Sequence, residues 1–239
     1  MNLPVSPRLA ITVAIGGLAA LDATPVAQTF VSQPLVTGTL IGVLWGDLRT
    51  ALQVAVVLQI LAASTVPVGA RTPEDYATGA VIGVTSALAL SGAHPFTLTH
   101  DACAMMGVMI GLIAAVLGAG LLRWQRRLNE GLSRWCEERL RVGEDGALAA
   151  AQRAAVVLAF AVGVAYCAVC LAVAVAGLAH IASSESLWLA RAWRLAQPLW
   201  LGLGLAQILH AFVQRRLARI SVFGAALIVA WLANVVGNP

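Results

Sequence analysis

Five polar side chains interrupt the apolar sequence in the first third of the chain, and their chemistry suits contact with a polar ligand. They are Asp22, Gln28, Gln59, Glu74 and Asp75. The carboxylates accept hydrogen bonds, and the amides both donate and accept them. An ionisable group at membrane depth is costly unless it has a partner or a function. If the chain lies in a membrane, these residues are therefore candidates for a binding site.

The composition indicates that the chain lies in a membrane. Of the 239 residues, 60% are hydrophobic and only 11% are charged, and the mean hydropathy is +0.86; soluble domains normally carry roughly 25% charged residues. Several apolar stretches approach the roughly 17 to 25 residues that a membrane-crossing helix needs. The sequence therefore predicts an all-α polytopic membrane protein, with one membrane domain over residues 1–239.

The region 9–92 is expected to contain broken or re-entrant helices. Its apolar runs lie at about residues 9–21, 35–45, 51–63 and 76–92. Several of them are too short to cross a hydrocarbon core of about 30 Å at 1.5 Å per residue. Broken backbone at this depth is tolerated only where protein or a water-filled cavity satisfies its polar groups, and transporters use such breaks to hold polar substrates.

Prolines, glycines and one aspartate divide this region. Pro34 can begin a helix because it has no N–H to leave unpaired. Gly38 and Gly42 form a GxxxG motif, which permits close backbone approach. After Gly46, the side chain of Asp47 can cap the next helix. The chain is then broken again at Pro67, Gly69 and Pro73.

Each candidate binding residue also has a purely structural interpretation. The amide of Gln59 can join two membrane helices without any ligand. Glu74 and Asp75 can form a first-turn pair that the helix dipole favours. Asp22 follows an apolar half-span, so its carboxylate is expected below the membrane interface. Because polar groups at that depth need one another or water, we predict that Asp22, Gln59 and the turn at 73–75 converge in space.

The second half of the chain is expected to be more regular. A span at 101–122 is followed by a basic amphipathic segment at 123–146 and by scaffold spans within 147–236. All 15 basic residues are arginines, and six of them lie between residues 123 and 141, so the positive-inside rule places this segment in the cytoplasm. Trp124 and Trp135 suit the membrane interface. Mixed charge beside a membrane favours a solvated helix over nucleic-acid binding.

Metal, cofactor and enzyme chemistry are not expected. Cys167 and Cys170 lie inside an apolar segment, where cysteine packs as a small apolar residue. The four histidines lack metal-ligand spacing, and the chain has no HExxH or GxSxG motif.

Three segments carry a further pattern: Leu-Asp at 21–22, QPLVTGTLIGVLWGDL at 33–48 and LQILAASTVPVGARTPEDYATGAVIG at 58–83. Their order and spacing resemble the N-terminal half of the membrane IIC component of the mannose/fructose/sorbose family of the bacterial sugar phosphotransferase system. The resemblance covers about residues 20–90. Two positions depart from the family pattern: Gln33 stands where the family commonly has Arg, and Pro-Glu-Asp replaces the more usual Pro-Pro-Asp.

The resemblance implies a permease subunit of the bacterial inner membrane, in a hetero-oligomer with a IID membrane subunit. Cytoplasmic IIA/IIB proteins would phosphorylate the sugar as it emerges, so the chain itself would not be an enzyme. Carboxylates and amides suit sugar hydroxyls, which both donate and accept hydrogen bonds. Gln59 matches the mid-helix Gln or Glu of the family, and Asp75 matches the acid of its Pro-Asp pair. The alternative is a non-transporting membrane interaction or regulatory protein derived from this family.

Overall fold

The protein is helical throughout the part that the computed structural model describes, which comprises residues 7–23, 29–63, 74–92, 98–184, 186–212 and 216–237. Its helices are α1 (Pro7–Ala23), α2 (Pro34–Trp45), α3 (Leu48–Ala63), α4 (Tyr76–Ser91), α5 (His100–Arg141), α6 (Ala147–Ser184), α7 (Ser186–Phe212) and α8 (Arg216–Gly237). Two of them, α5 and α6, are long and apolar enough to cross a membrane, and several shorter helices are apolar as well. The predicted class, an all-α polytopic membrane protein, is confirmed.

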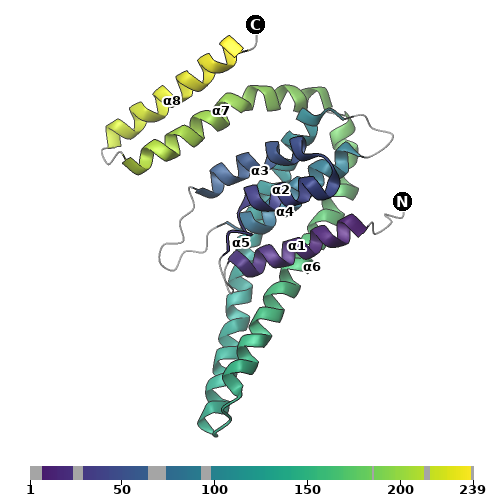
Figure 1. The fold of residues 1–239 in the computed structure, drawn as a ribbon, viewed down its shortest axis with the longest axis vertical. Helices are drawn as coiled ribbons and strands as arrows, with labels where there is room; N and C mark the ends of the chain where they lie inside the picture. Colours follow the sequence, from purple (N-terminus) through teal and green to yellow (C-terminus); the bar gives the residue numbers. More distant parts are fainter. Residues whose placement is uncertain are drawn as a thin grey trace.

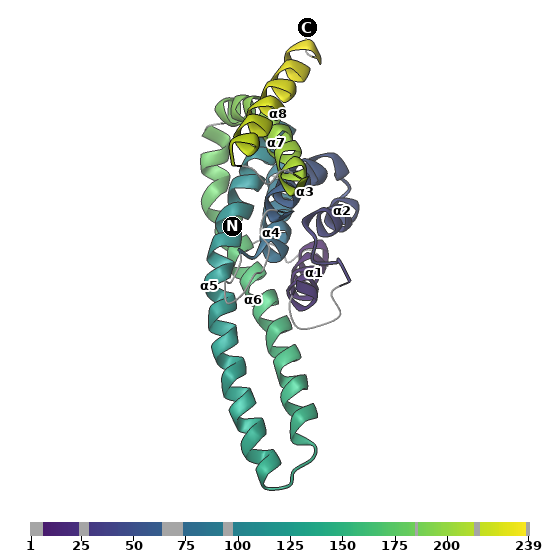
Figure 2. The same ribbon diagram turned by 90° about the vertical axis from the view of Figure 1, so that its left-hand side faces the viewer.

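The helices form three parts (Figures 1 and 2). Helices α1 to α4 gather around one half of the long hairpin made by α5 and α6. The other half of that hairpin projects away from them. Helices α7 and α8 run side by side at the opposite end of the molecule. The four short helices are therefore packed against the two long ones, and it is among the short helices that the polar candidate residues lie.

The short helices differ in length from an ordinary membrane span. Helix α2 has 12 residues, and α3 and α4 have 16 each, which corresponds to about 18 Å and 24 Å of helix. A hydrocarbon core is about 30 Å thick, so none of the three crosses it fully when oriented upright. This agrees with the expectation of broken helices in the region 9–92.

The turn between α2 and α3 forms as its residue types predict. Pro34 stands in the first turn of α2, and Gly46 ends this helix in the left-handed conformation with φ of 81°. A side chain on Gly38 or Gly42 would collide with α3, because their Cβ atoms would lie 2.4 Å from Ala55 Cβ and 2.7 Å from Ala51 Cβ. The GxxxG motif thus brings two helices of one hairpin into close contact.

Asp47 then caps α3. Its Oδ1 accepts a hydrogen bond of 3.0 Å from the backbone N–H of Thr50, as the capping interpretation predicts. Its Oδ2 lies 3.4 Å from Nδ1 of His100, at the start of α5. The predicted breaks at Pro67, Gly69 and Pro73, and the candidate Gln28, lie outside the described residues.

Helix α4 is the centre of the molecule. Thirteen of its sixteen residues are buried, a pattern typical of a helix surrounded by others. It crosses α5 through glycines on both sides: a Cβ on Gly83 would lie 2.5 Å from the carbonyl oxygen of Gly107, and a Cβ on Gly79 would lie 2.8 Å from that of Gly111. The two backbones touch there, which fixes the N-terminus of α4 against α5.

The charged segment expected after residue 122 is the continuation of α5 rather than a separate element. The helix has 42 residues without a break, or about 63 Å. Its charged end forms one of the two helical arms of the projecting hairpin in Figure 1. Trp124 and Trp135 are 48% and 38% exposed, and Arg139 forms an ion pair of 2.7 Å with Glu144 beyond the helix end. The segment is helical and largely exposed as far as Arg141, and its contact with solvent in the cytoplasm stays a prediction.

Candidate functional site

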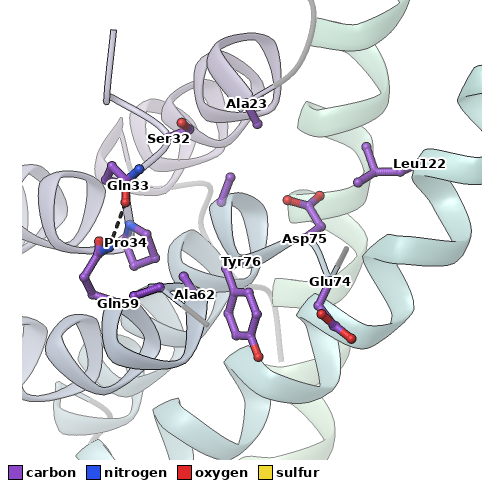
Figure 3. Close-up of a pocket in the computed structure, with 12 residues that line it drawn as sticks. Ala23, Ser32, Gln33, Pro34, Gln59, Ala62, Glu74, Asp75, Tyr76 and Leu122 are labelled. Atoms are coloured by element: carbon purple, nitrogen blue, oxygen red, sulfur yellow. Dashed lines mark hydrogen bonds between the residues drawn. The ribbon is translucent and has the colours of Figure 1, made fainter. Parts of the chain in front are cut away.

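A polar pocket opens where the short helices begin and end. Its volume is about 250 Å³, just below the roughly 300 to 1,000 Å³ of typical small-molecule sites. It is lined by the end of α1, the start of α2 and the residues before it, the end of α3, the start of α4 and the residues before it, and one residue of α5 (Figure 3). The polar side chains that line it belong to Ser32, Gln33, Gln59, Glu74, Asp75 and Tyr76.

Two glutamine side chains form one side of the pocket. Nε2 of Gln59 donates a hydrogen bond of 2.7 Å to Oε1 of Gln33, drawn as a dashed line in Figure 3. Oε1 of Gln59 accepts a bond of 3.2 Å from the backbone N–H of Leu35, in the unpaired first turn of α2. Gln59 therefore joins the end of α3 to the start of α2. Its amide has four hydrogen-bonding positions in total, of which these two bonds use one donor hydrogen and one acceptor lone pair.

Asp75 stands on the opposite side and is 7% exposed. Its Oδ1 caps α4 by accepting from the N–H of Thr78 at 3.2 Å, and its Oδ2 accepts from the Thr78 hydroxyl at 2.7 Å. Its own N–H donates to the carbonyl oxygen of Ala115 on α5, at 2.9 Å. These bonds hold the carboxylate between α4 and α5. Asp75 is therefore the N-cap of α4, and the first turn itself, which begins at Tyr76, contains no acid, so the expected first-turn pair is not formed. The capping role is compatible with a ligand because the residue also lines the pocket.

Glu74 and Tyr76 flank Asp75 and are half-buried. The backbone N–H of Tyr76 donates to the carbonyl oxygen of Glu74 at 3.0 Å, which tightens the entry into α4. In Figure 3 the carboxylates of Glu74 and Asp75 point in different directions. The carboxylates of the two acids therefore do not share one position.

Asp22 lies behind the pocket wall rather than in the pocket lining. It is 6% exposed, near the end of α1. Its Oδ1 accepts hydrogen bonds from the Thr29 N–H and from the Thr29 hydroxyl, the latter at 2.7 Å, and its Oδ2 accepts from the Ser32 N–H at 2.8 Å. Ser32 and Ala23, which follows Asp22, do line the pocket. The predicted convergence is thus confirmed for Gln59, Glu74 and Asp75, with Asp22 one layer behind them.

The sequence-based site omitted three polar lining residues, Ser32, Gln33 and Tyr76. The signal for Gln33 was present, because it replaces an arginine that the related family commonly has. A neutral amide there pairs with Gln59, whereas an arginine would bring a positive charge to the pocket. For Tyr76, the sequence gives no signal of a role in the site other than its position next to Asp75.

The lining residues favour an uncharged ligand with many hydroxyl groups. Two amides and two carboxylates provide donors and acceptors, and the part of the lining that the structure describes contains no arginine, lysine or histidine. A phosphate or carboxylate ligand cannot donate a hydrogen bond to the carboxylate of Asp75 and is repelled by it when both are ionised. A neutral polyol avoids this repulsion.

The position of Asp75 depends on the absence of a side chain at Gly118. A Cβ on Gly118 would lie 2.7 Å from Cβ of Asp75 and 3.3 Å from its Oδ2. We therefore expect Gly118→Ala to displace Asp75 from α5 and to lower ligand affinity by about tenfold, equivalent to about 1.4 kcal/mol. Gly120→Ala is the matched control, since a Cβ on Gly120 would have only the flexible side chain of Arg123 near it, at 3.8 Å. Equal ligand affinities for the two variants would contradict the packing argument.

The chain resembles known proteins in its fold and in its family. A search of curated proteins gave no match. Among solved structures, one described as "Structure of membrane protein" superposes with a TM-score of 0.68 and 16% sequence identity, covering 95% of this chain and 95% of that chain; this shows a shared fold. A family model described as the phosphotransferase system sorbose-specific IIC component matches residues 8–237. The chain therefore belongs to the sorbose-specific IIC component family of the sugar phosphotransferase system, whose members are membrane components of sugar transport.

Proposed function

We propose that the protein is the sugar-conducting subunit of a mannose-type phosphotransferase permease and that the polar pocket is its sugar site. It would work with a IID membrane subunit, and IIA/IIB phosphocarrier proteins would phosphorylate the sugar on the cytoplasmic side. The chain itself supplies recognition and passage, and the phosphoryl chemistry belongs to its partners. The substrate class is a neutral hexose or ketose.

The observation that carries this proposal is the pairing of amides with a buried carboxylate around one small pocket. Gln59 and Gln33 offer remaining donors and acceptors, and Asp75 offers a charged acceptor at the edge of α5. A hexose hydroxyl that donates to a carboxylate and accepts from an amide satisfies both groups. The carboxylate of Asp75 and the amide pair of Gln33 and Gln59 therefore share the recognition of the sugar.

Access to the pocket follows from the short helices that surround it. The N-terminus of α2, the C-terminus of α3 and the N-terminus of α4 lie beside the pocket. Helices that end within the membrane around a polar site are the arrangement by which transporters expose one site to either side in turn. We assign α2 and α3 to this mobile role and the longer helices after residue 146 to the scaffold.

A non-transporting role has one observation in its favour. Gln33 and Gln59 bond to each other, so the pair also satisfies the helix-joining interpretation, in which no ligand is needed. The two functions differ in what the protein does for a cell. A permease subunit supports sugar uptake when it is produced with its IID, IIA and IIB partners, whereas an interaction protein only binds them.

The test is uptake of radiolabelled mannose, fructose and sorbose by cells that lack other phosphotransferase permeases for these sugars. We expect uptake of at least one sugar with the wild-type chain and its partners, and background uptake when this chain alone is left out. Uptake that does not depend on this chain would contradict the permease assignment and favour the interaction protein.

Topology gives a separate prediction. The projecting end of α5 carries Arg123, Arg126, Arg127 and Arg134 close to its apolar part, so we expect it to lie in the cytoplasm. Glu130→Cys, in a chain whose four cysteines are replaced, should resist a membrane-impermeant maleimide in intact cells and react after permeabilisation. Labelling of equal extent in intact cells would place this segment outside and invert the proposed orientation.

A further inference from the structure

A carboxylate outside the pocket holds one of its walls in place. Asp22 accepts three hydrogen bonds from a turn that follows it by seven to ten residues: two from Thr29 and one from the N–H of Ser32. Both oxygens of the carboxylate are engaged, and the side chain is 6% exposed. The three bonds tie the end of α1 to the residues that lead into α2. We call residues 29–32 the wall turn.

The wall turn has a backbone conformation that needs such support. Phe30 has a φ of 67°, in the left-handed region that non-glycine residues rarely adopt. Its side chain is 70% exposed, so side-chain burial does not hold it there. Residues in this region cost free energy and persist only where the surroundings determine the conformation. The Asp22 bonds fall on either side of Phe30, at Thr29 and Ser32.

The anchor of the wall turn is rigid. Two residues of α1, Gly16 and Gly17, lie directly against α6: a Cβ on Gly16 would lie 2.4 Å from Sγ of Cys167, and one on Gly17 would lie 2.7 Å from Phe160. Helix α1 therefore packs closely on one of the long helices just before Asp22. A side chain held by such an element keeps its position better than one on a loop.

The wall turn leads directly into the sugar pocket. Ser32, Gln33 and Pro34 are consecutive lining residues, and the N–H of Gln33 donates to the carbonyl oxygen of Phe30 at 3.0 Å. Gln33 then receives the hydrogen bond from Gln59. The chain of contacts therefore runs from Asp22 through the turn to the amide pair, without Asp22 lining the pocket.

We infer that Asp22 is a positioning residue: it sets the conformation of the wall turn, and through it the amide pair of Gln33 and Gln59, rather than binding the sugar directly. This inference rests on the proposed sugar site for its functional consequence, but the contact between Asp22 and the wall turn exists without any ligand. The two claims can therefore be tested separately.

The first experiment needs no sugar. Amide hydrogen exchange is measured over residues 29–35 in the purified complex with the IID subunit, for the wild type and for Asp22→Asn. An asparagine keeps the size of the side chain but places an N–H₂ donor where one oxygen accepts a bond. We expect at least a tenfold faster exchange at the Thr29, Ser32 and Leu35 amides, with unchanged exchange in α4. Unchanged exchange at residues 29–35 would overturn the inference.

The second experiment is a double-mutant cycle on mannose and sorbose affinity with Asp22→Asn and Gln33→Ala. If Asp22 acts through Gln33, each single variant raises the dissociation constant by about tenfold and the double variant raises it little further. Losses that multiply to about a hundredfold would mean that Asp22 acts independently of Gln33, and would contradict the positioning role.

Two further variants separate positioning from general destabilisation. Thr29→Val removes only the hydroxyl contact at 2.7 Å and keeps both backbone bonds. We therefore expect a smaller increase in amide exchange and a smaller loss of sugar affinity than for Asp22→Asn. Thr29→Val also takes the place of Asp22→Asn in both experiments if that variant does not assemble. Asp47→Asn is the matched control, because Asp47 caps α3 at the far end of α2 and does not contact the wall turn. A wild type that binds no sugar would refute the proposed function, while the exchange experiment would still decide the role of Asp22.

Discussion

Replacement of Gln59 by leucine is expected to raise the dissociation constant for the sugar by at least about a hundredfold. Leucine cannot donate to Gln33 or accept from the Leu35 N–H, so the described hydrogen bonds of 2.7 and 3.2 Å are both lost. Leucine also removes the remaining donor and acceptor of the Gln59 amide, which the sugar hydroxyls would bind in the proposed site. Ligand hydroxyls left unmet away from water cost about 1 to 3 kcal/mol each, and a hundredfold change in affinity is about 2.7 kcal/mol. The volume of the side chain hardly changes, so the packing of α3 should be preserved.

The measurement is equilibrium sugar binding to the complex with the IID subunit, together with the yield of that complex. Gln53→Leu provides a matched control, because Gln53 lies on the same helix, does not line the pocket, and has a buried Oε1 without a described hydrogen bond. We expect normal yield for both variants and normal sugar affinity for Gln53→Leu only. Loss of complex formation by Gln59→Leu would instead favour the helix-joining interpretation of Gln59.

The second large effect is expected at the crossing of α4 and α5. Gly83→Ala would place a methyl group 2.5 Å from the carbonyl oxygen of Gly107 and 2.9 Å from Cα of Gly111, both on the backbone of α5. Neither contact is with a flexible side chain, so the helices must separate. Overpacking in a close-packed interior typically costs about 1 to 3 kcal/mol, and contact with backbone atoms places this variant at the upper end or beyond.

Thermal unfolding of the purified protein in detergent checks this expectation. Gly131→Ala is the control, since a Cβ at Gly131 meets no atom within 4 Å, and alanine favours a helix over glycine by about 1 kcal/mol. Gly83→Ala should lower the midpoint of unfolding by several degrees or prevent recovery of folded protein, whereas Gly131→Ala should leave the midpoint unchanged or raise it. Equal midpoints would contradict the direct backbone contact of α4 and α5.

Much of the N-terminal architecture could be predicted from single residues, because their roles are local. A proline without an N–H begins α2, a glycine with φ of 81° ends it, and the next carboxylate caps α3. These roles depend on backbone chemistry within one helical turn. The close contact at Gly38 and Gly42 could also be predicted, since close approach of two hairpin helices requires small residues at the spacing of a GxxxG motif.

The partners of the polar residues could not be predicted, because they depend on tertiary packing. The sequence placed Asp22 among the candidate ligands, yet its carboxylate bonds to Thr29 and Ser32 behind the pocket wall. The pairing of Gln33 with Gln59 joins residues 26 positions apart on two helices. The expected boundary at residue 122 also has no counterpart in the backbone, since a helix continues wherever its hydrogen bonds continue, whether lipid or water surrounds it.

The central claim is that the pocket between the ends of α2 and α3 and the start of α4 binds a neutral sugar. Its most direct test is the affinity of the purified complex with its IID subunit for mannose-type hexoses and related ketoses, in the wild type, Gln59→Leu and Asp75→Asn. Asp75→Asn keeps the shape of the side chain but removes the charged acceptor that the Thr78 hydroxyl and the pocket share. We predict measurable sugar binding by the wild type and at least about tenfold weaker binding by both variants. Equal affinities in all three proteins would contradict the assignment of the site.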